Sequence, residues 1–211
     1  EIDINMVCPF PLQTQTGRGA GLLRTPDIVA EIFNELKKYP NVKFSVKMRL
    51  GYDEKSQWQQ IMPILNDAPL NHVTLHSRIA TQQYKGDVDL YSFRQFYSEV
   101  NHRVVYNGDI STIEDIIRLK TEFPNLYGVM VGRGLLSSPS LAWEYKKDLR
   151  LSSEQQIEKF LMIHNKLFQF YESKLQGDSH LLTKMKTLWD YSEPLIGHKF
   201  YKQIKKSSNI A

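Results

Sequence analysis

Five short apolar segments separated by amphipathic ones most constrain the fold of this 211-residue chain. The apolar segments are rich in Val, Ile, Phe or Tyr, which is typical of β-strands. We predict strands near residues 3–7, 42–49, 71–76, 103–106 and 127–131, and helices over 25–38, 57–65 and 91–100, with further helices beginning near 111 and 138. Thr25 and Ser111 are the expected N-caps of two of these helices. Strands that alternate with helices form parallel βα units, so the sequence predicts an α/β fold.

Polar or glycine residues lie at the carboxyl end of every predicted strand. They are Asn5 and Cys8, Lys47 and Arg49, His76 and Arg78, Asn107 and Asp109, and Gly132 and Arg133. The carboxyl ends of parallel strands lie on one edge of a sheet, where α/β enzymes place their reactive groups. Pro9, Pro11 and the glycine-rich stretch 17–21 predict a rigid loop that presents the Cys8 thiol. We therefore expect a functional site at this edge.

Residues 151–211 contain no strand-like segment, and we predict three helices at 154–175, 180–191 and 194–206. They hold 9 Lys and Arg against 6 Asp and Glu, whereas residues 1–150 hold 18 against 17. We therefore expect two domains, 1–150 and 151–211, with the positive excess mainly in the second. Basic and aromatic side chains near residue 186 are typical of RNA contacts, but Trp189 equally suits a helical core.

The composition also bears on the class of protein. There is no apolar run of about 18 residues and no signal peptide, so we expect no membrane partner. The single cysteine cannot form an internal disulfide, which favours a reducing, cytoplasmic location. His and Cys residues show no metal-ligand spacing, so we predict no metal. A net charge of +4 favours a polyanionic partner.

Six motifs resemble those of the dihydrouridine synthase family, flavoenzymes that reduce uridine to dihydrouridine in transfer RNA. They are Asn5-Met6-Val7-Cys8-Pro9 and the stretches 17–23, 46–51, 75–78, 106–110 and 131–134, in family order within residues 1–148. The stretch 183–191 is similar, more loosely, to part of the family's C-terminal RNA-binding domain. Val7 stands where the family usually has glycine, and Lys184 and Lys186 stand where arginine is common.

This resemblance implies a fold. It is a TIM (β/α)₈ barrel, which takes eight strands and about 250 residues, followed by a small all-helical domain. Five predicted strands make the barrel incomplete here, so we expect the first strands, with a flavin-binding segment, upstream of Glu1. The full-length protein is expected to be a monomer. The present chain would leave a strand edge open, and we expect it to self-associate and to bind FMN poorly.

The resemblance also implies roles for individual residues. Cys8 would donate a proton to C5 of uracil, while hydride comes from reduced FMN, which NADPH reduces again. Lys47 and His76 would contact the flavin ring. The residues expected near the FMN phosphate are Asn107, Gly108, Asp109, Gly132 and Arg133. The expected contacts to substrate or RNA are Asn5, Arg18, Arg49, Arg78, Tyr84, Lys85, Lys184 and Lys186.

Two other functions stay open at this point. One is an FMN-dependent barrel oxidoreductase that acts on a small pyrimidine or an enone. The other is an RNA-binding module without catalysis, in which RNA binding survives a Cys8→Ala change. From the residues alone, Cys8 also fits a buried structural thiol, and the strand-end residues fit ordinary βα turns. The sequence leaves open which uridine is modified and whether NADPH or NADH is preferred.

Overall fold

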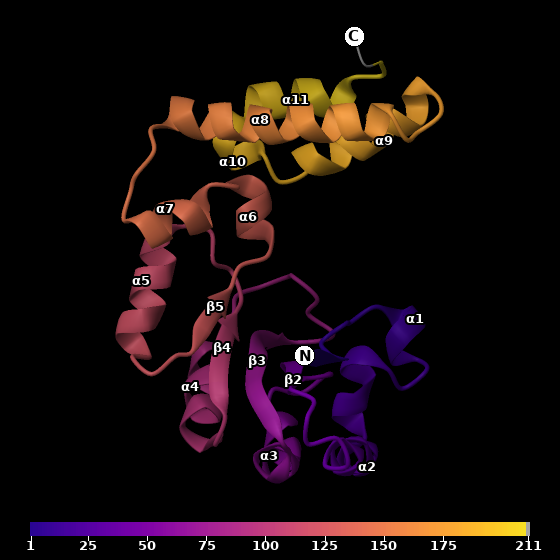
Figure 1. The fold of residues 1–211 in the computed structure, drawn as a ribbon, viewed down its shortest axis with the longest axis vertical. Helices are drawn as coiled ribbons and strands as arrows, with labels where there is room; N and C mark the ends of the chain where they lie inside the picture. Colours follow the sequence, from indigo (N-terminus) through magenta and orange to yellow (C-terminus); the bar gives the residue numbers. More distant parts are fainter. Residues whose placement is uncertain (210–211) are drawn as a thin grey trace. The chain divides into compact units, whose positions relative to one another are not determined.

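A five-stranded parallel sheet forms the first part of the protein (Figure 1). The computed structural model describes residues 1–209, and residues 210 and 211, the end of the expected second domain, lie outside this description. The strands are β1 (Ile2–Met6), β2 (Phe44–Gly51), β3 (Leu70–Ile79), β4 (Arg103–Asn107) and β5 (Gly128–Met130). They lie side by side in sequence order, and the sheet does not close within the described residues. The predicted α/β class with five parallel strands is confirmed.

The register of the strands gives the sheet one polar and one apolar face. Asn5, Lys47 and Thr74 lie in one row across β1, β2 and β3. In the next row on the same face, Arg49 pairs with His76 and His76 pairs with Asn107. The intervening row carries the buried side chains of Met6, Met48, Leu75 and Tyr106. Because successive side chains of a strand point to opposite faces, the predicted site residues share the polar face.

Helices that follow the strands pack on the apolar side chains. They are α2 (Pro26–Leu36), α3 (Trp58–Asp67) and α4 (Leu90–Glu99), and a further helix, α5 (Ile113–Glu122), follows β4 in sequence. Within this layer α3 contacts β2 and α4 contacts β3. The ring of Trp58 meets that of Phe96 edge-on at 5.6 Å, and Phe93 meets Tyr106 at 4.8 Å. These aromatic contacts join neighbouring βα units into one core.

The described chain divides into two compact units. The first comprises 1–108 and 120–130, and the second comprises 109–119 and the residues from 131 onward. The second unit is helical after β5, with α6 (Arg133–Ser137), α7 (Leu141–Lys147), α8 (Ser153–Glu172), α9 (Asp178–Trp189), α10 (Glu193–Ile196) and α11 (His198–Lys206). Helix α8 contacts α9, which contacts α11. A separate functional domain that begins at residue 151 stays a prediction.

Several predicted boundaries were wrong for identifiable reasons. Strand β3 continues to Ile79, three residues beyond the predicted end at His76, so Arg78 lies inside the strand and not after it. Helix α6 begins at Arg133, soon after β5, whereas we predicted that the next helix begins near residue 138. The last predicted helix, 194–206, is divided at Gly197, whose φ of 78° is a left-handed value that interrupts a helix.

One predicted N-cap is confirmed in position and the other was wrong. Thr25 is the N-cap residue of α2, which begins at Pro26 as predicted, but its hydroxyl donates to the Leu22 carbonyl at 3.3 Å and accepts no hydrogen bond from the helix. Helix α5 is capped by Thr112, whose Oγ1 accepts from the Asp115 N–H at 3.1 Å, while the Asp115 carboxylate accepts from the Thr112 N–H at 3.0 Å. This reciprocal pair is a capping box with aspartate in place of glutamate. Among residues 1–209 no helix has the length and apolarity needed to cross a membrane.

Candidate active site

Cys8 lies on a short loop after β1 that is held by backbone hydrogen bonds. The Asn5 side-chain oxygen accepts from the N–H groups of Val7 at 3.0 Å and Cys8 at 3.1 Å. The Cys8 carbonyl accepts from the N–H of Ala20 at 2.9 Å. The loop continues through the short helix α1 (Pro11–Thr14) and the 3₁₀-helix η1 (Gly19–Arg24). The Cys8 side chain is partly exposed, so the loop presents the thiol instead of burying it.

Gly19 allows η1 to lie directly against the backbone of Cys8. Its φ is +55°, and a Cβ at this position would lie 2.7 Å from the Cys8 carbonyl oxygen and 3.0 Å from its Cβ. Any other side chain would therefore displace the loop as well as strain the backbone. The nearby Arg18 is exposed, and its backbone N–H bonds to the Gln13 carbonyl at 2.9 Å. Its contact with RNA stays a prediction.

Lys47 is a partly buried cation on the polar face of the sheet. Burial, followed by the charge of Arg49, lowers the pKa of its ammonium to about 8 from a usual 10.5, and Asp3 opposes this shift. Across the part of the chain that the structure describes, Lys47 has neither a hydrogen-bond nor an ion-pair partner. An ammonium desolvated without a partner is a binding point for an anionic or carbonyl oxygen.

Arg49 is 1% exposed, two positions along the same strand. Its Nε donates to the Val7 carbonyl at 2.9 Å, and its Nη1 donates to the carbonyls of Ile79 at 3.0 Å and Gln83 at 2.9 Å. Burial lowers its pKa to about 10, so the guanidinium is still cationic at neutral pH. Arg49 thus binds the loop of Cys8 to the loop after β3. The predicted contact of Arg49 with RNA is untested.

His76 and Arg78 come from β3, and both are nearly inaccessible, at 4% and 2% exposure. The Arg78 guanidinium binds the Gly86 carbonyl through Nε at 3.2 Å and Nη2 at 2.5 Å. The His76 ring lies 6.2 Å from that of Tyr84, which is 50% exposed. Lys85 is exposed. The loop 80–89 therefore offers an aromatic ring and a cation to solvent above a buried His and Arg, and their ligand contacts stay predictions.

The residues expected to bind phosphate fall in both units. In the first unit the Asn107 amide donates to the Met130 carbonyl at 2.8 Å, and Gly108 has a φ of +144°. In the second unit Arg133 forms an ion pair with Asp109 at 2.9 Å. Gly132, at the start of the five-residue helix α6, has open space where a Cβ would lie. Their joint role in holding a phosphate stays a prediction.

Lys184 and Lys186 of α9 differ in their surroundings. Lys184 is exposed. The Lys186 ammonium donates to the carbonyls of Lys205, at 3.1 Å, and of Ser207. A cation at these carbonyls stabilises the C-terminal end of α11. Lys186 therefore has a structural role in the helical unit, and a contact with RNA from either lysine is untested.

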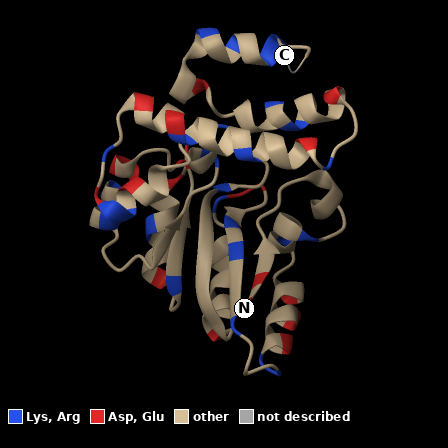
Figure 2. Cartoon of the chain, turned by 45° about the horizontal axis from the view of Figure 1, so that its top comes forward, with Lys and Arg blue, Asp and Glu red and all other residues tan. Residues whose placement is uncertain are grey.

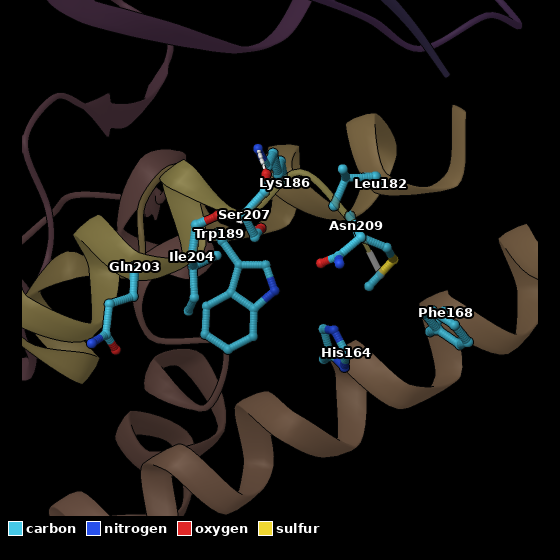
Figure 3. A pocket seen from close by; sticks show the side chains of 10 residues that line it. His164, Phe168, Leu182, Lys186, Trp189, Gln203, Ile204, Ser207 and Asn209 are labelled. Carbon is cyan, nitrogen blue, oxygen red and sulfur yellow. Dashed lines mark hydrogen bonds between the residues drawn. The ribbon is translucent and has the colours of Figure 1, made fainter. Parts of the chain in front are cut away.

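A cavity of about 350 Å³ lies among α8, α9 and α11 (Figure 3). The Trp189 indole meets Phe160 edge-on at 4.8 Å and His164 at 5.5 Å. In Figure 3 the indole lies in the middle of the view, with His164 and Phe168 of α8 beyond it. Trp189 therefore both packs in the helical core and lines an open aromatic surface, so it fits both sequence interpretations.

Basic side chains recur along α11, which contains no acidic residue (Figure 2). Lys205 is paired with Asp190, while Lys199, Lys202 and Lys206 are exposed. Within residues 1–209 no group of three His, Cys, Asp or Glu side chains is arranged to hold a metal ion. The charge of the helical unit suits a polyanion, and its surface offers rings as well as cations.

Comparison with known proteins assigns the family. Residues 1–209 match the sequence model of a family described as "Dihydrouridine synthase (Dus)". The chain belongs to the dihydrouridine synthase family. It is 29% identical over 195 residues to a "Probable tRNA-dihydrouridine synthase" of Helicobacter pylori, a match that covers 91% of this chain and 57% of the relative. It is also 29% identical over 176 residues to a protein of the same name from Staphylococcus aureus, covering 81% and 52%. The chain thus spans about half the length of the curated relatives it matches.

The sheet of the first unit brings several of the predicted site residues onto one face. Asn5, Lys47, Arg49, His76 and Asn107 share the polar face of the sheet. Sequence reasoning missed the backbone contributors, above all the carbonyls of Gln83 and Gly86 that bind the two buried arginines. Every residue has a backbone carbonyl, so the sequence does not mark which carbonyls bind a side chain. The available signals were Gly86, which can adopt unusual backbone conformations, and the two arginines at strand ends, which need acceptors if they are buried.

Proposed function

We propose that the protein containing this chain reduces uridine to 5,6-dihydrouridine in tRNA. Membership of the dihydrouridine synthase family supports the reaction class, and the names of the relatives point to tRNA. The observation in the structure that carries the proposal is the Cys8 loop. Asn5, Ala20 and Arg49 hold it beside the polar face of the sheet.

We propose FMN as the cofactor, and the residues of the polar face fit it. Lys47 is a partly buried ammonium without a partner in the described chain, placed to donate to the oxygen-bearing edge of an isoalloxazine ring. His76 would contact the same ring, and Asn107 and Gly108 at the end of β4 would lie near its ribityl phosphate. In the second unit, Asp109, Gly132 and Arg133 are the proposed phosphate contacts. Reduced FMN, when bound, supplies hydride, and NADPH is the proposed reductant.

The protein's part in the reaction is a proton transfer and its positioning. As C6 of uracil gains hydride, C5 gains a proton from the Sγ–H of Cys8, so that the C5–C6 double bond becomes single. A thiol suits this step because it can donate a proton to carbon and be reprotonated between turnovers. The thiolate then recovers a proton from solvent, which the partial exposure of Cys8 permits. Extrusion of the uracil from its stack is needed before it reaches such a site.

RNA would be held by both units. In the first, Arg18, Tyr84 and Lys85 are the exposed candidates, and Arg78 and Asn5 are the proposed contacts nearer the uridine. In the second, Lys184 and the lysines of α11 are exposed to a phosphate backbone. We propose that residues 151–211 act as the RNA-binding domain and that the sheet belongs to a TIM barrel completed by further strands. A monomer in the cytoplasm, where tRNA is modified, is the proposed working form.

Visible spectroscopy of the purified natural protein tests the proposal. A flavin absorption band is expected, which bleaches on anaerobic addition of NADPH and returns when unmodified tRNA is added. A free pyrimidine or an enone that restores the band while tRNA does not would favour the small-molecule oxidoreductase. A colourless protein that takes up no added FMN but binds tRNA would overturn the enzyme proposal in favour of an RNA-binding module.

A further inference from the structure

Two loops of the first unit meet at the guanidinium of Arg49. One carries Cys8, and Arg49 binds it through the Val7 carbonyl, next to the cysteine in sequence. The other is the loop after β3, which Arg49 binds through the carbonyls of Ile79 and Gln83. A single buried side chain therefore spans the loop with the proposed proton donor and the loop with the proposed RNA contacts.

The second loop is built around this contact. Gln83 has a φ of +52°, an uncommon conformation for a residue with a side chain. Its carbonyl points to Arg49, and the next residue, Tyr84, has its ring centroid 5.8 Å from the Arg49 guanidinium carbon. A shift of Tyr84 therefore acts on the Arg49 side chain both through Gln83 and directly.

A packing role alone does not account for an arginine at this position. Among the described residues no carboxylate forms an ion pair with Arg49, so its charge is buried at a cost that carbonyl dipoles and the neighbouring Tyr84 ring offset in part. An apolar side chain would fill a purely structural position without that cost. The planar guanidinium is the group that can bond to carbonyls in two directions at once.

We propose that Arg49 is a positioning residue, which fixes the Cys8 thiol relative to the Tyr84 loop so that ligand contact at this loop sets the position of the proton donor. The inference rests on the proposed function for the role of Cys8. Its hydrogen bond to the Val7 carbonyl holds the loop of the proton donor, and its charge also interacts with that of Cys8.

The test compares Arg49→Met, Arg49→Lys and Leu50→Ala in the natural protein. Leu50 is the adjacent residue on the same strand and is fully buried, so Leu50→Ala matches the loss of stability without touching either loop. The first measurement is the rate of thiol labelling of Cys8 by a disulfide reagent, corrected with a Cys8→Ser protein. Arg49→Met is expected to raise the rate about tenfold, Arg49→Lys to give a smaller rise, and Leu50→Ala to leave it unchanged.

The second measurement is the kinetics of uridine reduction. Arg49→Met is expected to lower kcat by a larger factor than it raises KM for tRNA, because the thiol is displaced while the side chains that contact RNA remain on their loop, and Arg49→Lys is expected to recover part of kcat. Wild-type labelling in Arg49→Met, or an equal rise in Leu50→Ala, would overturn the proposal. If Arg49→Met does not fold, wild-type labelling and kcat in Arg49→Lys would overturn it. If the wild type reduces no uridine, the proposed function fails, while the labelling rates still decide the position of Cys8.

Discussion

Lys47 makes the stability of the ligand-free protein depend on pH in a defined direction. Its pKa is about 8 in the folded protein and 10.5 when exposed, chiefly because burial disfavours the charged ammonium. Between these two values the unfolded chain binds more protons than the folded one. The free energy of unfolding therefore rises with pH from about 8 to 10.5, and the charged side chain destabilises the fold below that window.

The size of this effect follows from the shift. At about 1.36 kcal/mol for each pKa unit, the difference has an upper bound of about 3.4 kcal/mol. Lys47 is only partly buried, and screening by solvent reduces the figure to about 1–2 kcal/mol. Lys47→Met keeps the length and apolar stem while removing the charge. It is expected to stabilise the protein by this amount at pH 7 and to remove the corresponding rise above pH 8.

Urea denaturation at several pH values between 7 and 10.5 measures this difference. Lys43→Met is the matched control, because Lys43 lies next to the same strand, is exposed, and should leave the pH dependence as it is in the wild type. Added FMN should flatten the wild-type dependence as well, since an acceptor at the ammonium raises its pKa. A Lys47→Met protein with the wild-type pH dependence, or one less stable than wild type at pH 7, would refute the argument.

Two further substitutions test the packing around the site and the helical unit. Gly19→Ala should lower the free energy of unfolding by about 2–4 kcal/mol and slow uridine reduction, because the new Cβ would lie 2.7 Å from the Cys8 carbonyl oxygen. Gly17→Ala is the control, because Gly17 also has a positive φ, +71°, but open space around it, and it should lower the free energy of unfolding by only about 1 kcal/mol. Equal losses for the two variants in urea denaturation would contradict this. Glu144→Ala should lower the free energy of unfolding by about 2–3 kcal/mol, because the carboxylate of Glu144, which is 2% exposed, accepts a hydrogen bond from the Leu151 N–H at 2.9 Å. Glu144→Gln keeps an acceptor oxygen and should lower it by less. Calorimetry measures both variants, and a Glu144→Ala protein as stable as the wild type would show that this hydrogen bond does not hold the segment after α7 in place.

Much of the fold of the first unit was predictable because its strands alternate apolar and polar residues and its helices have apolar faces. Strand β2 illustrates this, since Lys47 and Arg49 lie on one face and Met48 on the other, as alternation requires. The end of β3 was missed because a charged residue such as Arg78 usually marks a strand end. Arg78 remains in the strand because the Gly86 carbonyl of the following loop accepts hydrogen bonds from its buried guanidinium.

The site was predictable at the level of residue types and less so at the level of contacts. The side chains of Asn5 and Lys186 were expected to meet substrate or RNA, and the structure places both on backbone groups of the protein. Such choices depend on which carbonyl or N–H is left over after folding, and sequence spacing does not carry that information. The cap of α5 shows the same limit, since Ser111 and Thr112 are adjacent hydroxyl residues and only the backbone geometry selects Thr112.

The most direct test of the central claim is the conversion of uridine to dihydrouridine in an unmodified tRNA transcript by the natural protein with FMN and NADPH. Mass spectrometry of the RNA digest would follow a gain of two hydrogens per modified base in the wild type and in Cys8→Ala. We predict conversion by the wild type, and a loss of about 10²–10⁴-fold in Cys8→Ala while tRNA binding and the flavin spectrum persist. Conversion by Cys8→Ala at the wild-type rate, or a flavin-loaded wild type that leaves every uridine unreduced, would contradict it.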